Sequence, residues 1–298
     1  MGLTQGNPAG PLAFLASLSP SVGSYTGVCP AEGGKTPLIG HIQYPEGERS
    51  ARILFLMPEE GLDQPALPTL LEHLAIQAGT WGAFHLLAEV EESSGALEGL
   101  RRSGFSVYAW QRIWKYLPKG DAASGNGAAT GSAKNGNSPW HPVTSLDEIS
   151  VRNLYQALVP PLVQSAEPLT LGRLTGWVYR QEDEIMAYVE GASGPHGIYL
   201  QPLIHPAVEN VSQVLSSLLQ RQPTLLGRPV FLAIRSYQAW LETIMRDQEV
   251  QVGPRQALLV KHLVMHQRAA QPARHSVLEK YTAEPTAPIV QNSTATND

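Results

Sequence analysis

The sequence predicts an α+β protein with two domains, each built on a mixed, mostly antiparallel sheet with helices on its faces. Two observations lead to this prediction. One order of strands and helices occurs twice along the chain, and a stretch without large apolar residues separates the two copies. The 298 residues, of which 43% are hydrophobic, are enough for about two domains that each bury a core.

The two copies align at an offset of 145 residues without a gap. Runs of strand-forming residues and apolar residues at helical spacing predict the order β-α-β-α-β in both. The first copy has strand 52–56, a helix with Leu67 to Leu74, strand 84–88, a short helix around 100–101 and strand 107–111. The second has strand 197–201, a helix with Val211 to Leu219, strand 229–233, a short helix around 245–246 and strand 252–256. The pattern indicates a duplicated fold.

Further elements precede this unit in the second copy. Ser145 and Glu148 have capping-box spacing, which predicts a helix to about residue 158, before the prolines at 160 and 161. Two β-rich runs, 176–180 and 185–189, flank a polar turn and predict a hairpin. The first copy has a looser counterpart, 38–43, with little room ahead of it for a full first strand and helix. We therefore expect the first domain to be truncated at its start.

Changes in composition predict the domain boundaries. Residues 119–138 are mostly Gly, Ala, Ser, Asn and Thr, which indicates a flexible linker, and residues 269–298 are polar with three prolines, which indicates a disordered tail. The expected organisation is an N-terminal domain over 1–118, a linker over 119–139, a C-terminal domain over 140–268 and a tail over 269–298. We expect the two domains to pack on each other.

Charge and cysteine content exclude several classes of protein. A formal charge of −5 without a long basic run argues against nucleic acid as a partner. Cys29 is the only cysteine, which rules out an internal disulfide or a Cys-x-x-Cys zinc or redox site. The N-terminus lacks the pattern of a signal peptide, and no window is apolar enough for a membrane span. We therefore expect a cytoplasmic protein without a membrane partner.

Three motifs of known site types are incomplete or absent in the sequence. Gly33-Gly34-Lys35-Thr36 resembles part of a phosphate-binding P-loop, but its first glycine is missing and no helix follows, so a surface turn is the better interpretation. His262 and His266 stand four residues apart, without the Glu that follows the first His in zinc helices. We expect no metal site. The Gly-x-Ser-x-Gly motif of α/β-hydrolases does not occur.

A helix, a hairpin and then β-α-β-α-β, repeated in one chain, resembles two tandem domains of the GNAT (Gcn5-related N-acetyltransferase) superfamily. The resemblance covers most of 30–118 and 140–268. The family often has Asn-x-x-Ala-x-x-Leu-Tyr-x-x-x-Gly-Phe through its last helix and strand. The first copy matches this signature at Ala96, Gly104 and Phe105, whereas Ser93, Gly99 and Leu100 replace its Asn, Leu and Tyr. The second copy retains none of it.

The resemblance implies binding of acetyl-CoA or another acyl-CoA through a glycine-containing loop at a helix N-terminus, where backbone N–H groups hold the pyrophosphate. Neither copy has that loop. The first has the acidic run 58–64, and the second has 205–210 without a glycine. Glu59, Asp63 and Glu209 in these two loops also fit as ordinary helix-start acids. If the second copy binds the cofactor, the residues expected there are Leu203, Ile204, Ala207, Val208, Glu209 and Asn210.

For catalysis, the chemistry requires a base for the amine proton and an acid for the departing thiolate. The candidates are Glu190, His205 and Tyr237, each of which also fits as a solvated or core polar residue. The resemblance implies N-acyl transfer to an amine on a small molecule or a protein. The alternatives are a catalytically silent ligand-sensing or protein-interaction module, or a structural scaffold. An open gap between the two central strands beside Leu203 and His205 would favour the enzyme, and bulky side chains filling it would exclude acyl-CoA.

Overall fold

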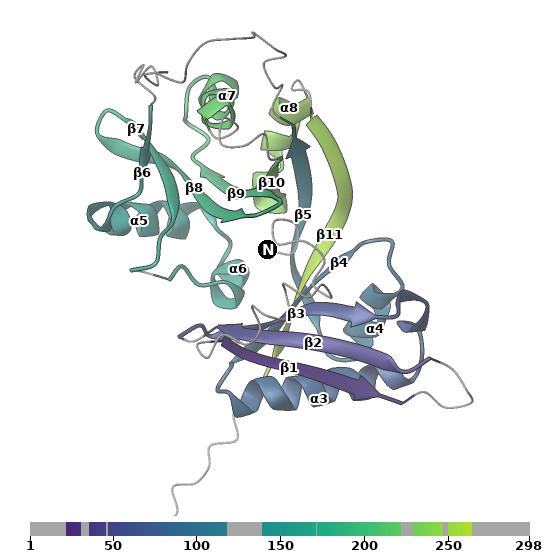
Figure 1. Ribbon diagram of the computed structural model, residues 1–298. Coiled ribbons are helices and arrows are strands. Elements are labelled where there is room, and N and C mark those ends of the chain that lie inside the picture. Colours follow the sequence, from purple (N-terminus) through teal and green to yellow (C-terminus); the bar gives the residue numbers. More distant parts are fainter. Residues whose placement is uncertain are drawn as a thin grey trace, which may run out of the picture. The chain divides into compact units, whose positions relative to one another are not determined.

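The computed structural model describes residues 22–30, 36–45, 47–117, 139–170, 172–221, 229–246 and 250–263, which Figure 1 shows as coloured ribbon. The predicted tail, most of the predicted linker, residues 33–35 and His266 lie outside these ranges. The strands are β1 Val22–Cys29, β2 Leu38–Pro45, β3 Ser50–Met57, β4 His85–Glu91, β5 Ser106–Tyr116, β6 Trp140–Pro142, β7 Gly176–Gln181, β8 Glu184–Gly194, β9 Gly197–Ile204, β10 Val230–Arg235 and β11 Val250–His262. The helices are α3 Ala66–Thr80, α4 Ala96–Arg102, α5 Glu148–Leu158, α6 Pro161–Ala166, α7 Val211–Arg221 and α8 Trp240–Arg246, with 3-10 turns η2 Glu59–Gly61, η3 Ser145–Asp147 and η4 Ser236–Gln238.

The predicted β-α-β-α-β order is present in both copies, and the hairpin of the second copy is β7–β8. The first copy has a hairpin as well, because β1 pairs antiparallel with β2 in the position that β7 has beside β8. No counterpart of β6 lies among the described residues, and the expected truncation of the first domain stays a prediction. One detail differs from the prediction. The capping box lies one residue earlier than predicted, because Thr144 N–H and Thr144 Oγ1 both donate to Asp147 Oδ2 at 2.8 Å. Thr144 is therefore the N-cap in place of Ser145.

The strands of the described residues all belong to one sheet, in the order β1-β2-β3-β4-β11-β5-β10-β9-β8-β7-β6. The last strand of each copy lies in the other half of the sheet. β11 from the second copy pairs with β4, and β5 from the first copy pairs with β10. These two strands also pair antiparallel with each other and run side by side in Figure 1. The sequence repeat predicts two similar halves but does not predict this exchange of strands.

The strand order is symmetric about the pair β11–β5, except that β6 has no counterpart among the described strands. Gln111 lies opposite Gln256, its counterpart at the offset of 145, and Gln111 Nε2 donates to Gln256 Oε1 at 3.0 Å. Gln111 also pairs with Arg235 in β10, and Gln256 pairs with Glu91 in β4. Arg235 and Glu91 therefore correspond at an offset of 144. The offset of 145 is therefore correct for the last strands, β5 and β11. For β4 and β10 the correct offset is 144, one residue less than the ungapped alignment predicts.

Helices cover both faces of the sheet. On β4, Leu86 and Ala88 pack with α3 and α4, whereas Leu87 packs with α5 and α6. Successive side chains of a strand point to opposite faces, so α3 and α4 cover one face and α5 and α6 the other. On β9, Leu200 and Ile204 likewise pack with α7 and α8, and Leu203 packs with α5 and α6. We call the face of α3, α4, α7 and α8 the first face, and that of α5 and α6 the second face.

Candidate functional site

The sheet opens at two places, where the parallel pairs β3–β4 and β9–β10 diverge. β3 pairs with β4 only over Ser50 to Arg52, and β9 pairs with β10 only over Ile198 to Leu200. Beyond these residues the facing strand edges lack a neighbouring strand, so their backbone N–H and C=O groups need other partners. The two gaps are therefore the places where a ligand could pair with the sheet.

The gap between β9 and β10 is bridged by the side chain of Gln238. Its Nε2 donates to the Ile204 carbonyl oxygen at 2.9 Å, and its Oε1 accepts from the Ile204 N–H at 3.2 Å. Gln238 is 2% exposed and Ile204 is fully buried. A primary amide offers a donor and an acceptor, as a peptide group does. The Gln238 side chain thus takes the place of a neighbouring strand and occupies the edge of β9.

The gap between β3 and β4 contains a cavity of about 190 Å³. Residues 53–56 and 88–90 line the cavity, together with Glu59, Leu62, Ser94, Ala96 and Leu100. A register shift in the β2–β3 pairing makes Leu54 a bulge residue and leaves it 39% exposed. The residues that correspond to Gln238, Ser93 and Ser94, have shorter side chains, and Ser94 Oγ accepts instead from the Ala96 N–H at 3.3 Å. This gap is therefore open.

A cluster of charged and phenolic side chains lies on the second face. At its centre, Glu167 directly follows α6; Oε1 accepts from Tyr108 Oη at 2.6 Å, and Oε2 accepts from Arg235 Nη2 at 2.9 Å. Arg52 Nη1 lies 3.9 Å from Oε1. We call the set the Glu167 cluster; it comprises Arg52, Tyr108, Tyr155, Glu167, Gln201 and Arg235. It joins β3 and β5 of the first copy to α6, β9 and β10 of the second.

Arg235 carries more hydrogen-bonding capacity than its neighbours satisfy. The residue is 5% exposed, and Nη2 donates to both Glu167 and Gln201. Its Nε and Nη1 are buried and have no partner among the described residues. Burial alone would raise the pKa of Glu167, but the two guanidinium groups and the Tyr108 hydroxyl lower it. Glu167 is therefore an anion in contact with two cations, and the Glu190 carboxyl is a second acidic group within electrostatic reach of both.

Two of the predicted catalytic residues, Glu190 and Tyr237, lie within electrostatic reach of the Glu167 cluster. Burial and the Glu167 charge raise the pKa of the Glu190 carboxyl, although the residue keeps exposed surface. Burial also raises the pKa of Tyr237 to about 12, which keeps its phenol neutral. His205 is placed differently, because its Nδ1 accepts from the Ala207 N–H at 3.2 Å in the loop before α7. Glu190 and Tyr237 thus lie within electrostatic reach of the same cluster, whereas His205 forms a hydrogen bond within its own loop.

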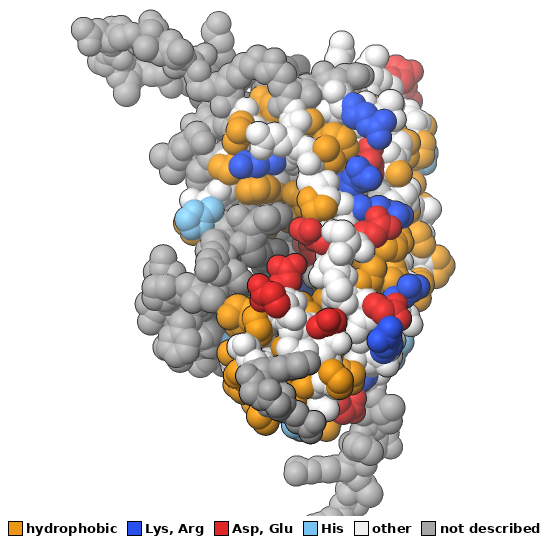
Figure 2. Space-filling model, turned by 90° about the vertical axis from the view of Figure 1, so that its right-hand side faces the viewer, with side chains coloured by type: hydrophobic (Ala, Val, Ile, Leu, Met, Phe, Trp, Pro, Cys, Tyr) orange, Lys and Arg blue, Asp and Glu red, His pale blue; other side chains and the backbone are white. Residues whose placement is uncertain are grey.

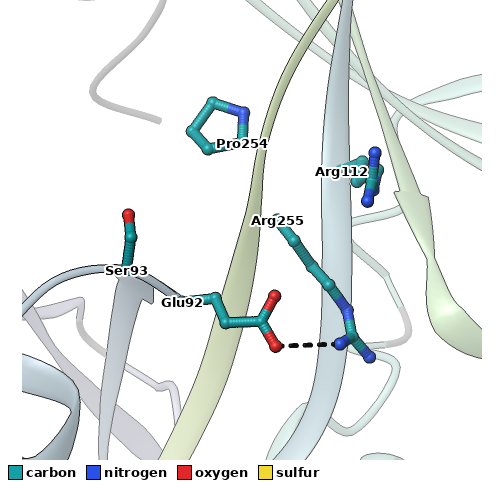
Figure 3. A pocket seen from close by; sticks show the side chains of 5 residues that line it. All are labelled: Glu92, Ser93, Arg112, Pro254 and Arg255. Carbon is teal, nitrogen blue, oxygen red and sulfur yellow. Dashed lines mark hydrogen bonds and ion pairs between the residues drawn. The ribbon is translucent and has the colours of Figure 1, made fainter.

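A separate hollow of about 330 Å³ is lined by Glu92, Ser93, Arg112, Pro254 and Arg255 (Figure 3). Arg255 reaches from β11 toward the loop after β4, where Nη1 lies 3.0 Å from Glu92 Oε1. Its guanidinium also stacks on the Trp110 ring, 4.1 Å from the centroid. Arg112 has Glu242 at 3.8 Å. Arg255 and Arg112 thus each have a carboxylate partner. Figure 2 shows acidic and basic side chains interspersed on one face of the molecule.

Comparison with known proteins bears on the fold. No protein-family model and no curated protein matches the sequence. The chain is similar to a solved GCN5-related N-acetyltransferase from Kribbella flavida, at 13% identity over 84% of this chain and 93% of that one, with a TM-score of 0.50. The chain has the GNAT fold. This confirms the α+β fold class expected from the sequence.

Two further solved structures resemble the chain. One is a tandem GNAT protein from the clavulanic acid biosynthesis pathway, at 16% identity, 87% and 90% coverage and a TM-score of 0.47. The other is a GCN5-related N-acetyltransferase from Sphaerobacter thermophilus, at 12% identity, 76% coverage of each chain and a TM-score of 0.46.

The start of α3 is where a GNAT fold would place the pyrophosphate of acyl-CoA, and the residues there do not fit that group. The N–H groups of Gly61, Leu62, Gln64 and Leu67 donate to carbonyl oxygens within the same turns. The prolines at 65 and 68 have no N–H to offer, and Glu59, Glu60 and Asp63 add negative charge. Few donors are left for an anion in this acidic loop.

Gly61 has a packing role, because an added Cβ would meet Leu38 at 2.7 Å and Gln64 at 2.9 Å. The cavity next to this loop has a volume of about 190 Å³. Ordinary ligand pockets are larger, at about 300–1,000 Å³. The acidic loop therefore argues against the pyrophosphate of acyl-CoA beside this gap.

The residues expected to bind cofactor in the second copy divide into two groups. Leu203, Ile204 and Val208 are buried in the cores beneath the helices. Ala207, Glu209 and Asn210 are exposed in the loop before α7. Their role as a cofactor site remains a prediction, and Gln238 occupies the strand edge beside them.

Glu167, Arg235, Tyr108 and Gln238 are functional candidates that the sequence did not predict. Arg235 had a visible signal, because it ends an otherwise apolar strand, Val230–Arg235, at a position where a charge needs a partner. Within the described residues, no group of three or more His, Cys, Asp or Glu could hold a metal ion. None of the helices described is long and apolar enough to cross a membrane.

Proposed function

We propose that this protein is a catalytically silent GNAT-fold module that binds a small molecule and does not use acyl-CoA. The observation that carries the proposal is the start of α3, where turn carbonyls already engage the N–H groups of Gly61, Leu62, Gln64 and Leu67 and acidic residues surround them. The bridging of the second gap by Gln238 supports it, because the edge of β9 is no longer available for a thioester ligand.

The test is thermal unfolding of the full chain with and without millimolar acetyl-CoA, CoA and pantetheine. A ligand at about 100 times its Kd adds about 2.7 kcal/mol to the free energy of unfolding. We expect no change in midpoint with acetyl-CoA or CoA. Pantetheine lacks the pyrophosphate, so it separates the contribution of the acyl arm from that of the nucleotide, and we expect no change with it either. A rise of several degrees with acetyl-CoA would overturn the proposal.

N-acyl transfer to an amine is the second candidate, and the open β3–β4 gap favours it. Its sides are formed by strand edges that no other strand covers, as the acyl arm of a thioester would require. Glu190 supports it further, because a carboxyl with a raised pKa suits a general base near neutral pH. The measurement is thiol release from acetyl-CoA with a panel of amines. Turnover that Glu190→Gln abolishes would establish the enzyme, and its absence with all amines would leave the silent module.

A further inference from the structure

We infer that the second face binds a small amino-carboxylate, with its carboxylate on Arg235 and its ammonium group on Glu190. The inference deepens the proposed ligand-binding function and rests on it. Unlike the gaps in the sheet, this site is polar and is formed by both copies, because Arg52 and Tyr108 come from the first copy and the other members of the Glu167 cluster from the second.

The unpartnered nitrogens of Arg235 indicate the carboxylate. A buried donor without a partner costs about 1–3 kcal/mol, so native proteins rarely leave one unpaired. Nε and Nη1 of Arg235 are both in this state among the described residues, while Nη2 is fully used by Glu167 and Gln201. Guanidinium groups bind carboxylates well because several N–H donors lie in one plane. An arriving carboxylate would satisfy donors that the protein leaves free.

The charges of the Glu167 cluster agree with an anion. Glu167 contacts two guanidinium groups, with Arg235 at 2.9 Å and Arg52 at 3.9 Å. Its Oε1 also accepts from Tyr108 Oη at 2.6 Å, so one carboxylate is shared by three donors. Arg52 is 55% exposed, so its charge is largely solvated, whereas the charge of Arg235 is buried. Arg235 contacts the Glu167 carboxylate through Nη2 alone, so a ligand carboxylate would add a second contact on Nε and Nη1.

Glu190 supplies the opposite charge for an amine. It lies on β8 opposite Gln201 of β9, whose Oε1 accepts from Arg235. Ala187 and Val189 pack on the first face, so the alternation along β8 puts Glu190 on the second face, where Arg235 and Glu167 also lie. The Glu190 charge acts on Tyr155, Tyr199 and Tyr237. A molecule with an amine near its carboxylate would therefore pair with both ends of the site.

The experiment is thermal unfolding of the full chain with each of the twenty common L-amino acids at millimolar concentration, followed by calorimetric titration of those that stabilise it. Acetate and methylamine at the same concentration serve as single-group probes. We expect at least one amino acid to raise the midpoint and to bind more tightly than either probe. No response from any amino acid, or equal binding of acetate alone, would overturn the inference.

Two variants and a matched control test whether Arg235 and Glu190 bind the amino-carboxylate. Arg235→Lys keeps a cation beside Glu167 but removes the Nε and Nη1 donors, and we expect it to weaken binding about tenfold or more, or about 1.4 kcal/mol. Glu190→Gln removes the charge at an exposed position, so folding is preserved even if the Arg235 variant unfolds, and we expect a similar loss. Glu184→Gln, at an exposed position on the same strand, is the matched control. Unchanged affinity in Glu190→Gln would overturn the assignment.

Failure of this inference and failure of the proposed function give different results. If acetyl-CoA stabilises the protein and an amino acid also binds, the silent module is wrong and the amino-carboxylate site remains, then as an acceptor site. If neither binds, the amino-carboxylate site is wrong while the absence of acyl-CoA binding stands.

Discussion

Replacing Gln238 with Leu tests whether this side chain takes the place of a strand. Leu has a similar size, so the substitution opens little space, but it removes both hydrogen bonds to Ile204. Because Ile204 is fully buried, its N–H and C=O would lose their partners inside the protein. At about 1–3 kcal/mol for each unsatisfied group, we expect the free energy of unfolding to fall by about 2–6 kcal/mol. This is a large part of the ~5–15 kcal/mol that stabilises a typical domain.

Urea unfolding followed by tryptophan fluorescence measures this loss. With a slope of about 2 kcal/mol per molar urea, the midpoint should fall by about 1–3 M while the slope stays constant. Gln213→Leu, at an exposed position on α7, is the matched control and should change stability by less than about 0.5 kcal/mol. A loss below about 1 kcal/mol for Gln238→Leu would mean that water satisfies Ile204, and the second gap would then count as open.

Three further substitutions test other parts of the fold. Gly176→Ala should destabilise the protein by about 3 kcal/mol or more, because Gly176 has φ +119° and an added Cβ would collide with the Val189 carbonyl; a normal melting temperature would contradict this. Trp140→Phe removes the bond from Nε1 to the Val214 carbonyl at 2.9 Å and part of a fully buried ring, so urea titration should show a loss of about 2 kcal/mol. The pKa of Asp147 is lowered, because hydrogen bonds and a guanidinium partner outweigh the opposing effect of burial, so its contribution is present above the unfolded pKa of about 4 and is lost as the pH falls through the folded value. The stability difference between the protein and Asp147→Asn should therefore shrink in acid, and a constant difference would contradict the pKa shift.

The elements were predictable because their signals are local. Alternating β-branched residues, apolar residues at helical spacing and turn residues depend on neighbours along the chain, and the hairpin β7–β8 follows them closely, with Glu182 and Asp183 at positive φ in its turn. The start of α5 shows the limit of such signals. Thr144 with Asp147 and Ser145 with Glu148 both satisfy the capping-box spacing, and only the structure shows that the Thr144 pair is used.

The pairing of distant strands could not be predicted in the same way. Nothing in residues 106–116 or 250–262 indicates which copy supplies their neighbours, since an exchanged and an unexchanged strand present the same alternating pattern. The Glu167 cluster depends on that exchange, because Tyr108 on β5 reaches Glu167 of the other copy. Glu190 and Tyr237 could be proposed from their places near strand ends, whereas the importance of Glu167 is visible only once Tyr108, Arg52 and Arg235 surround it.

The exchange of last strands affects how the chain must fold during synthesis. β5 is made early, yet its partners are β10 and β11, and β4 finds its neighbour in β11 near residue 260. The first half therefore emerges from the ribosome with an unpaired edge on β4, and it completes its sheet only when almost the whole chain is present. Because these contacts are so distant in sequence, folding should be slow for a protein of this size. A chain cut between the copies would yield two pieces that each carry a strand belonging to the other, so neither piece has a complete sheet until they recombine.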